Sequence, residues 1–228
     1  MSARVACVIP AYRAERTLAN VVTRLRDVVA QARVIVVDDG SPDATGTVAE
    51  DVADWVVRFA VNRGKGAALR AGFAHALGSD AQIVLTLDAD GQHDPSYVPR
   101  LVAALEGHDI VVGQRMRSGS SMPLGRRLTN ALASAAIAHV AGIRLNDTQS
   151  GFRAIRRCVL ERVNAEGDRY EFETDFLIRA GRAGFRVCNA VIPTVYGAAS
   201  HFRGMSDSVR IVKTIWSHRR PIPPSVRS

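Results

Sequence analysis

The first half of the chain alternates short apolar runs with stretches in which apolar residues recur every three or four positions. Residues 34–37 form one such run, and Leu18, Val21, Val22 and Leu25 fall on one side of a helix in the stretch before it. Uninterrupted β-branched runs are typical of strands buried on both faces of a sheet. Strands that alternate with helices indicate parallel pairing, with helices on both faces. The sequence therefore predicts an α/β fold with a Rossmann-like, mostly parallel central sheet.

The same patterns predict the extent of each element. The predicted strands are residues 4–9, 34–37, 55–59, 82–87, 109–112 and 185–192, and the predicted helices are residues 18–29, a short segment after 42, 66–77, about 95–106, 123–141, 174–183 and 206–217. Residues 115–125, rich in Gly and Ser, are predicted to be a mobile loop, and residues 148–156 a loop with a hairpin strand. We expect one domain over residues 1–228, because two full domains would be cramped at this length.

Composition narrows the classes of protein to consider. The chain is 47% hydrophobic, and we find no uninterrupted apolar run of the roughly 18 residues that a membrane span needs. Three separated cysteines, Cys7, Cys158 and Cys188, without CxxC spacing argue against a disulfide framework and a zinc site, so a cytoplasmic location is expected. The net charge of +8 would suit an anionic lipid, a phosphorylated substrate or nucleic acid. Aromatic residues do not interleave with the basic clusters, so a nucleic-acid platform is not expected.

Acidic residues follow two of the predicted strands. Asp38 and Asp39 end the strand at 34–37, and Asp88 and Asp90 follow the strand at 82–87. Open parallel sheets bind ligands at the carboxyl ends of their strands, and carboxylates at short spacing suit Mg²⁺ or Mn²⁺ shared with substrate phosphates. The alternative is a set of turn-forming and capping aspartates, which accounts well for Asp94 but poorly for Asp88 and Asp90.

A glycine-rich turn precedes the helix predicted at residues 66–77. Residues 62–66 (NRGKG) match neither a Walker loop nor a G-x-G-x-x-G fingerprint. The helix N-terminus that follows, with Lys65 beside it, could face a diphosphate. A plain strand-to-helix turn explains the glycines equally well, and both interpretations stay open.

Five segments occur in a fixed order: residues 8–12 (VIPAY), 36–41 (VVDDGS), 62–66 (NRGKG), 87–93 (LDADGQH) and 149–153 (QSGFR). In this order they resemble glycosyltransferase family 2, which has the GT-A fold. The greatest similarity is to the dolichyl- and polyprenyl-phosphate sugar transferases. The resemblance implies a metal-dependent, inverting transfer of a sugar from a nucleoside-diphosphate sugar to an acceptor. It also implies that residues 1–113 form the donor half, and residues 114–228 the acceptor half with its C-terminal helix.

The resemblance assigns roles on the donor side. The positions implied to hold the nucleotide sugar are Pro10, Tyr12, Asp38, Asp39, Lys65, Asp88, Ala89 and, in a C-terminal loop, Arg203. Asp88 and Asp90 match the DxD motif, and Gln92 matches an additional ligand for Mg²⁺ or Mn²⁺. Asp90 is accordingly counted among the catalytic residues.

The resemblance also assigns roles on the acceptor side. Arg115 matches a catalytic basic residue near the transferred sugar, and Arg126, Asn130 and Arg153 match positions that face an acceptor phosphate. Glu173 and Asp175 are candidate bases for a hydroxyl acceptor. Both begin a predicted helix, however, where acidic residues also favour the helix dipole.

Several functions stay open at this stage. The acceptor is expected to be a polyprenyl phosphate, with the same chemistry on a soluble hydroxyl as the alternative; a nucleotidyltransferase and a sugar-nucleotide binding module are further candidates. The predicted C-terminal helix carries apolar residues beside basic ones and ends near Trp216, which suits contact with the inner face of a membrane. The alternative is that the helix packs its apolar side on the domain.

Overall fold

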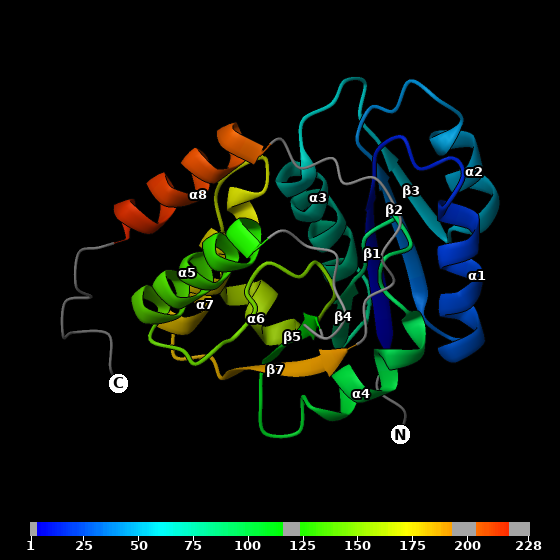
Figure 1. The fold of residues 1–228 in the computed structure, drawn as a ribbon. Coiled ribbons are helices and arrows are strands. Elements are labelled where there is room, and N and C mark those ends of the chain that lie inside the picture. Colours follow the sequence, from blue (N-terminus) through cyan, green and yellow to red (C-terminus); the bar gives the residue numbers. More distant parts are fainter. Residues whose placement is uncertain (1–3, 116–123, 193–203, 219–228) are drawn as a thin grey trace.

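A computed structural model describes residues 4–115, 124–192 and 204–218, without the side chains of 115, 124–131 and 204–208. Seven strands form one sheet in the order β3-β2-β1-β4-β6-β5-β7 (Figure 1). The strands are β1 (Val5–Ala11), β2 (Arg33–Asp38), β3 (Trp55–Arg58), β4 (Ile83–Thr86), β5 (Ile110–Arg115), β6 (Arg153–Arg156) and β7 (Val187–Ile192). Only β6 runs antiparallel to its neighbours. The predicted α/β fold with a mostly parallel sheet is confirmed.

Helices cover both faces of the sheet. They are α1 (Leu18–Val28), α2 (Thr45–Val52), α3 (Lys65–Leu77), α4 (Val98–Ala103), α5 (Leu124–Ala141), α6 (Arg157–Arg162), α7 (Glu171–Arg182) and α8 (Gly204–Ser217), with a 3₁₀ turn at Pro95–Tyr97. Helices α1, α2 and α4 pack on one face, and α3, α6 and α7 on the other. Helices α5 and α8 pack outside α7.

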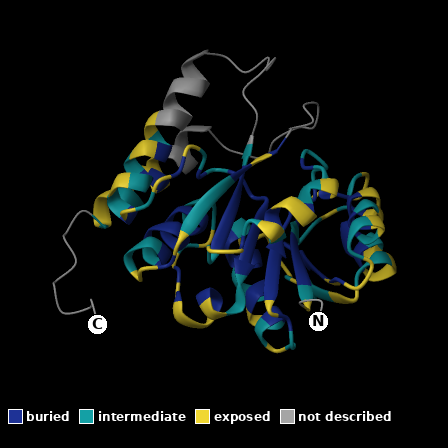
Figure 2. Cartoon of the chain, turned by 90° about the horizontal axis from the view of Figure 1, so that it is seen from below, coloured by how far each residue is buried: buried dark blue, intermediate teal, exposed yellow. Residues whose placement is uncertain are grey.

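The core has two layers because successive side chains of a strand point to opposite faces of the sheet. In β2, Val34 and Val36 join the layer under α1, while Ile35 and Val37 join the layer under α3. Figure 2 shows the resulting band of buried strands between more exposed helices. The apolar runs of the sequence are thus strands buried on both sides, as predicted.

Two features of the second half differ from the sequence-based expectation. The predicted hairpin strand is β6, which lies in the middle of the sheet between β4 and β5 instead of pairing in a hairpin. Helix α6 was not predicted at all. Its six residues follow β6 directly, a length too short to display a helical period clearly.

None of the described helices combines the length and the apolar character that a bilayer span requires.

The packing of α3 on β1 gives a stability prediction. A Cβ atom at Gly72 of α3 would lie 2.2 Å from Cγ1 of Val8, so Gly72→Ala must push the helix from the sheet. Overpacking of this kind costs about 1–3 kcal/mol in the free energy of unfolding. Urea denaturation should detect that loss, whereas Ala74→Ser, on the exposed side of the same helix, should change stability by less than about 0.5 kcal/mol. Equal stability of the two variants would contradict the close packing.

Candidate active site

The carboxyl ends of β1, β2 and β4 meet at one edge of the sheet. Ala11 at the end of β1 lies beside Asp38 at the end of β2. Strand β4 pairs with the other side of β1 and leads two residues later to Asp88. The sheet therefore brings the two acidic segments of the sequence to the same edge, which is where open parallel sheets bind ligands.

Asp39 is anchored in the turn that precedes α3. Its carboxylate accepts hydrogen bonds from Asn62 Nδ2 (2.9 Å), the backbone N–H of Arg63 (2.6 Å) and the backbone N–H of Gly64 (2.9 Å). Burial raises the pKa of Asp39, although the N–H groups of Arg63 and Gly64 act in the opposite direction. The buried carboxylate thus holds the glycine-rich turn in place, a role that the sequence analysis did not assign to it.

Asp38 and the end of β1 form the neighbouring part of the edge. Asp38 is buried, accepts a hydrogen bond from the N–H of Ser41 (3.0 Å), and lies 3.5 Å from Nε of Arg58. Tyr12 follows the partly buried Pro10 by two residues and lies under the guanidinium of Arg13. The predicted nucleoside-binding residues are therefore gathered at one place.

The glycines at 64 and 66 allow another part of the chain to approach α3. A Cβ atom at Gly64 would lie 2.4 Å from the carbonyl oxygen of Asp168, and one at Gly66 would lie 2.7 Å from that of Arg169. The N–H of Ala67 donates to the same Asp168 oxygen. Since this segment packs on the first turn of α3, the geometry favours the strand-to-helix turn over an open diphosphate site at the helix N-terminus.

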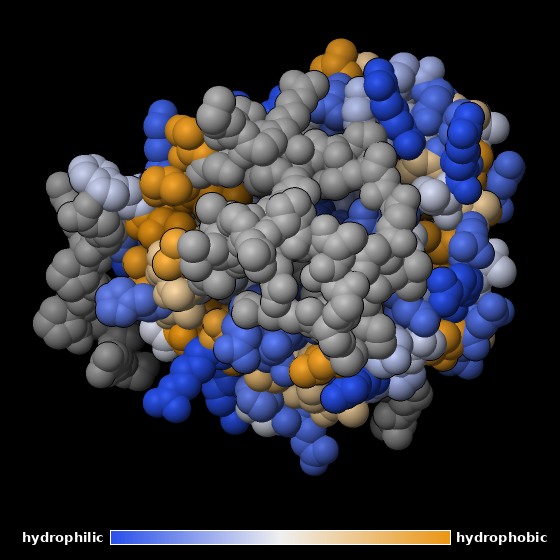
Figure 3. Space-filling view, in the orientation of Figure 1, coloured by the Kyte–Doolittle hydropathy of each residue, from blue (hydrophilic) through white to orange (hydrophobic). Residues whose placement is uncertain are grey.

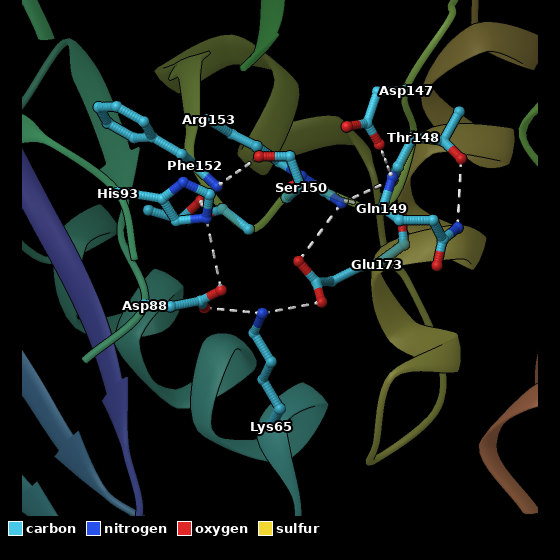
Figure 4. Close-up of polar contacts among 12 residues, drawn as sticks. Lys65, Asp88, His93, Asp147, Thr148, Gln149, Ser150, Phe152, Arg153 and Glu173 are labelled. Atoms are coloured by element: carbon cyan, nitrogen blue, oxygen red, sulfur yellow. Dashed lines mark hydrogen bonds and ion pairs between the residues drawn. The ribbon is translucent and has the colours of Figure 1, made fainter. Parts of the chain in front are cut away.

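Four charged side chains of alternating sign run through the site (Figure 4). Nζ of Lys65 lies 2.7 Å from Oδ1 of Asp88 and 3.1 Å from Oε2 of Glu173, and Nη2 of Arg153 lies 3.3 Å from Oε1 of Glu173. Burial alone lowers the pKa of Lys65, but the carboxylates of Asp88 and Glu173 outweigh it and hold the pKa above its ordinary value. Burial alone raises the pKa of Asp88, but Lys65 outweighs it and the pKa is lowered. Lys65 and Asp88 thus carry charge near neutral pH.

Asp88 also contacts the segment that precedes β6. A Cβ atom at Gly151 would lie 2.4 Å from Oδ2 of Asp88, so only glycine lets the chain pass this carboxylate. Nε2 of His93 lies 3.9 Å from the same oxygen, and the His93 ring packs on Phe152 at a centroid distance of 5.5 Å. Gly151 and Phe152 were noticed only as parts of a motif, and their contact with Asp88 depends on a strand pairing that the sequence does not reveal.

Asp90 and Gln92 lie in a tight turn after Asp88. Oδ1 of Asp90 accepts a hydrogen bond from the N–H of Gln92 (2.9 Å), and Ala89 is buried between the two acids with its carbonyl oxygen 2.6 Å from Oγ1 of Thr17. Burial, and after it the nearby Asp88 carboxylate, raise the pKa of Asp90. A divalent cation would relieve this repulsion, so the oxygen donors of Asp88, Asp90 and Gln92 fit Mg²⁺ or Mn²⁺ chemically.

The described part of the chain does not offer a complete metal cage. Within it, no three His, Cys, Asp or Glu side chains are grouped so that they could hold a metal ion by themselves. Gln92 would add an amide oxygen to the two aspartates, and a bound phosphate would have to supply further ligands. Mg²⁺ commonly binds in this way, through one or two carboxylates together with substrate phosphates.

Two residues predicted for the acceptor side, Arg153 and Asp175, are held by contacts within the protein. Arg153 is only 3% exposed, and its guanidinium donates to the carbonyl oxygens of Ser150 (2.9 Å) and Thr148 (3.2 Å) besides pairing with Glu173. In the structure these donors are directed at the protein, and contact of Arg153 with an acceptor phosphate stays a prediction. Through these hydrogen bonds Arg153 holds the loop before β6.

Asp175 is not part of the Asp88 group. Two residues along a helix turn a side chain by about 200°, so Asp175 and Glu173 face opposite sides of α7. Asp175 lies 2.6 Å from Nε of Arg179 and 2.6 Å from Nε2 of His218 at the end of α8, and accepts from the N–H of Glu166. In the structure its carboxylate links α7 to the residue that follows α8, and its role as a base for a hydroxyl acceptor stays a prediction.

The remaining predicted residues lie outside what the structure describes. Arg115 ends β5, and Arg126 and Asn130 lie on α5, but their side chains are not described. Arg203 falls between the described segments. By contrast, Asp43 and Asp94 are turn and capping residues: Asp43 accepts from the N–H of Thr45, and Asp94 from the N–H of Ser96.

Comparison with known proteins agrees with this geometry. The sequence model of the family described as glycosyl transferase family 2 matches residues 6–163, more than half of the chain. The chain is 34% identical over 203 residues to the undecaprenyl-phosphate mannosyltransferase of Micrococcus luteus, covering 84% of both proteins. It is 32% identical to the polyprenol monophosphomannose synthase of Mycolicibacterium smegmatis, over 83% of this chain and 76% of that protein. The protein therefore belongs to glycosyl transferase family 2.

A solved structure shares the fold. Glucosyl-3-phosphoglycerate synthase from Mycobacterium tuberculosis, crystallised with Mn²⁺, UDP and phosphoglyceric acid, superposes with a TM-score of 0.75 at 25% identity. The match covers 98% of this chain and 81% of that one. The predicted GT-A fold is confirmed. Within the family, the named relatives agree with the predicted branch of polyprenyl-phosphate sugar transferases, so the chain is a glycosyltransferase similar to that branch.

The anchoring role of Asp39 gives a second stability prediction. Asp39→Ala would leave the buried N–H of Gly64 and the partly buried N–H of Arg63 without their acceptor, and each such loss costs about 1–3 kcal/mol. We expect a total loss of about 3 kcal/mol in the free energy of unfolding, measured by urea denaturation. Asp43→Ala, which removes a turn-forming carboxylate at the start of α2, should cost only about 1 kcal/mol. A smaller loss for Asp39→Ala than for Asp43→Ala would refute the anchoring role.

Proposed function

We propose that the protein transfers a sugar from a nucleoside-diphosphate sugar to a polyprenyl phosphate, with inversion at the anomeric carbon. The observation that carries the proposal is the pair Asp88 and Asp90 at the carboxyl edge of a GT-A sheet. The named relatives add support, since two of them are described as acting on undecaprenyl phosphate or as making a polyprenol monophosphomannose.

The donor would bind at the ends of β1, β2 and β4. Pro10 and Tyr12 flank Ala11, which pairs with Asp38 in the sheet, and would form the wall for the nucleoside. Asp39 would act mainly through the turn at Asn62–Gly64, because its oxygens already accept several N–H groups. Lys65 lies next to Asp88 and would supply positive charge for the diphosphate.

Asp88, Asp90 and Gln92 would hold a Mg²⁺ or Mn²⁺ ion together with the diphosphate. Such an ion supplies Lewis-acid chemistry, because it neutralises the charge that develops on the departing nucleoside diphosphate. Both ions occur with UDP in structures of the M. tuberculosis enzyme named above. The chain's own contribution would be to hold the two carboxylates together at a partly buried site.

The state of the two candidate bases favours a phosphate acceptor. A hydroxyl acceptor must lose a proton to a base, whereas a phosphate oxygen is already anionic near neutral pH. Glu173 has one oxygen on Lys65 and the other on Arg153, and Asp175 is held by Arg179 and His218. Transfer to a hydroxyl therefore stays the alternative, and it would require one of these ion pairs to open.

The choice of acceptor can be tested directly. With the correct sugar nucleotide and Mn²⁺, the protein should glycosylate a short polyprenyl phosphate and leave the corresponding polyprenol unchanged. Asp90→Asn should lower the rate at least ~100-fold, because one carboxylate near the leaving diphosphate is lost. Radiolabelled sugar transfer into the lipid phase measures both.

Asp94→Asn is the matched control for this experiment. Asp94 lies in the same loop, but it caps the turn at Ser96 and pairs with Arg24. The Asp94→Asn variant should retain most of the transferase activity. Two results would reject the proposed reaction. One is transfer to the polyprenol at a rate similar to that for the polyprenyl phosphate, and the other is full activity of Asp90→Asn in excess chelator.

Helix α8 offers a surface for the membrane that carries such an acceptor. Ile211 is buried and Ile215 packs beside the small core cluster of α5 and α7, whereas Val209, Val212 and Trp216 are 50–66% exposed. Hydrophobic residues gather over α8 in Figure 3. The exposed basic residues Arg210 and Lys213 lie between them. We propose that this outward side rests on an anionic bilayer, since apolar residues and Trp beside basic residues suit the interface.

Liposome flotation tests this contact. Val212→Ser/Trp216→Ala should abolish most flotation with vesicles containing anionic lipid, and vesicles of neutral lipid should bind the unmodified protein less well, since each basic residue adds about 1 kcal/mol near an anionic surface. The control is Val61→Ser, which removes a 67% exposed valine that is far from α8 in the sequence. Equal flotation of all three proteins would exclude α8 as the contact.

A further inference from the structure

The ammonium of Lys65 occupies the space between the two halves of the site. It lies within 3.1 Å of two carboxylates, Asp88 after β4 and Glu173 on α7, and its side chain is only 16% exposed. A cation bound at Asp88 would meet this fixed positive charge at close range. Any ion that uses Asp88 must therefore compete with Lys65 for the carboxylate.

Glu173 is fixed more firmly than Lys65. Its other carboxylate oxygen pairs with Arg153, and its backbone oxygen accepts from Nη1 of the same guanidinium (3.4 Å). Arg153 is held in turn by the carbonyl oxygens of Ser150 and Thr148 (Figure 4). Because Glu173 cannot follow the ammonium, α7 determines how far Lys65 is drawn away from Asp88.

We propose that Lys65 is an internal counter-cation that competes with a divalent cation for Asp88, and that Glu173 is a positioning residue that limits this competition. The inference rests on the proposed metal-dependent function and adds a consequence to it. The bare cation binds weakly while Lys65 remains on Asp88. A donor diphosphate, which can accept the ammonium itself, removes the competitor and admits the cation.

The proposal predicts shifts of opposite sign for two substitutions, read from Mn²⁺ binding without nucleotide. Lys65→Met removes the competing charge, so Mn²⁺ should bind ~10-fold more tightly, the order expected when a unit charge near a partly buried carboxylate is removed. Glu173→Gln leaves the ammonium on Asp88 alone, so Mn²⁺ should bind roughly 3-fold more weakly. Electron paramagnetic resonance of free Mn²⁺ measures the dissociation constant on the full chain.

Charge-matched variants separate competition from a general change in charge. Lys65→Arg keeps the positive charge and should bind Mn²⁺ within about 2-fold of the unmodified protein. If Lys65→Met does not fold, Lys65→Met/Glu173→Gln removes one charge of each sign and leaves the net charge unchanged. This double variant should still bind Mn²⁺ more tightly than the unmodified protein, because Asp88 has lost its partner.

The same variants test whether Glu173 acts through Lys65. In the Lys65→Met background, Glu173→Gln should weaken Mn²⁺ binding by less than half as much, on a logarithmic scale, as it does alone. An equal effect in both backgrounds would mean that Glu173 acts only by its own field, and would overturn its positioning role.

The proposed competition is overturned if folded Lys65→Met, or the double variant, binds Mn²⁺ no more tightly than the unmodified protein. It is also overturned if no variant binds Mn²⁺. These results are independent of the proposed function. If the unmodified protein transfers no sugar from any sugar nucleotide tried, the proposed reaction fails while the Mn²⁺ titrations still decide the role of Lys65.

Discussion

The candidate site depends on the ammonium of Lys65, because it lies between two carboxylates from different parts of the chain, the partly buried Asp88 and the buried Glu173. An ionised carboxylate that loses its partner inside a protein is strongly destabilising, so Asp88 relies on Lys65, whereas Glu173 has Arg153 as a second partner. The local chain is arranged to place that cation. Asp39 holds the turn before α3, and the glycines on either side of Lys65 let the segment around Asp168 pack against it.

Strand β6 explains how the second half of the chain reaches this edge. Arg153, the first residue of β6, pairs in register with Thr86 at the end of β4, and Oγ1 of Thr86 donates to the carbonyl oxygen of Gly151. An antiparallel strand in this position delivers the loop before it to the carboxyl ends of the parallel strands. The loop at 148–151 therefore passes beside Asp88, and Arg153 ties it to Glu173 on α7. The two halves of the chain therefore share one continuous polar network at this edge.

The sequence predicted well what depends on local patterns. The apolar runs at 34–37 and 82–87 give strands β2 and β4, because their apolar side chains are buried on both faces of the sheet. Asp38 and Asp88 follow these runs and therefore lie at the edge of the sheet. Contacts between distant segments were not predictable in this way. Arg153 and Glu173 each matched a motif, but nothing in their spacing indicates that they neutralise each other. The resemblance pairs Asp175 with Glu173 as candidate bases, although helical geometry directs Asp175 to His218, which follows α8. The fold was thus accessible from periodicity, and the pairing of charges only from the topology.

The pairing of charges also bears on the chemistry that the edge can perform. A carboxylate whose two oxygens are both held by basic side chains must give up one of these contacts before it can accept a proton from a substrate hydroxyl. Glu173, which contacts Lys65 and Arg153, and Asp175, which contacts Arg179 and His218, are both in this condition. Asp90 is different, because burial and the neighbouring Asp88 carboxylate raise its pKa. A carboxylate such as Asp90, which a neighbouring carboxylate repels, attracts a cation more readily than it positions a substrate hydroxyl. The arrangement thus supports the proposed reaction, in which the edge gathers positive charge around a diphosphate and the acceptor brings its own negative charge.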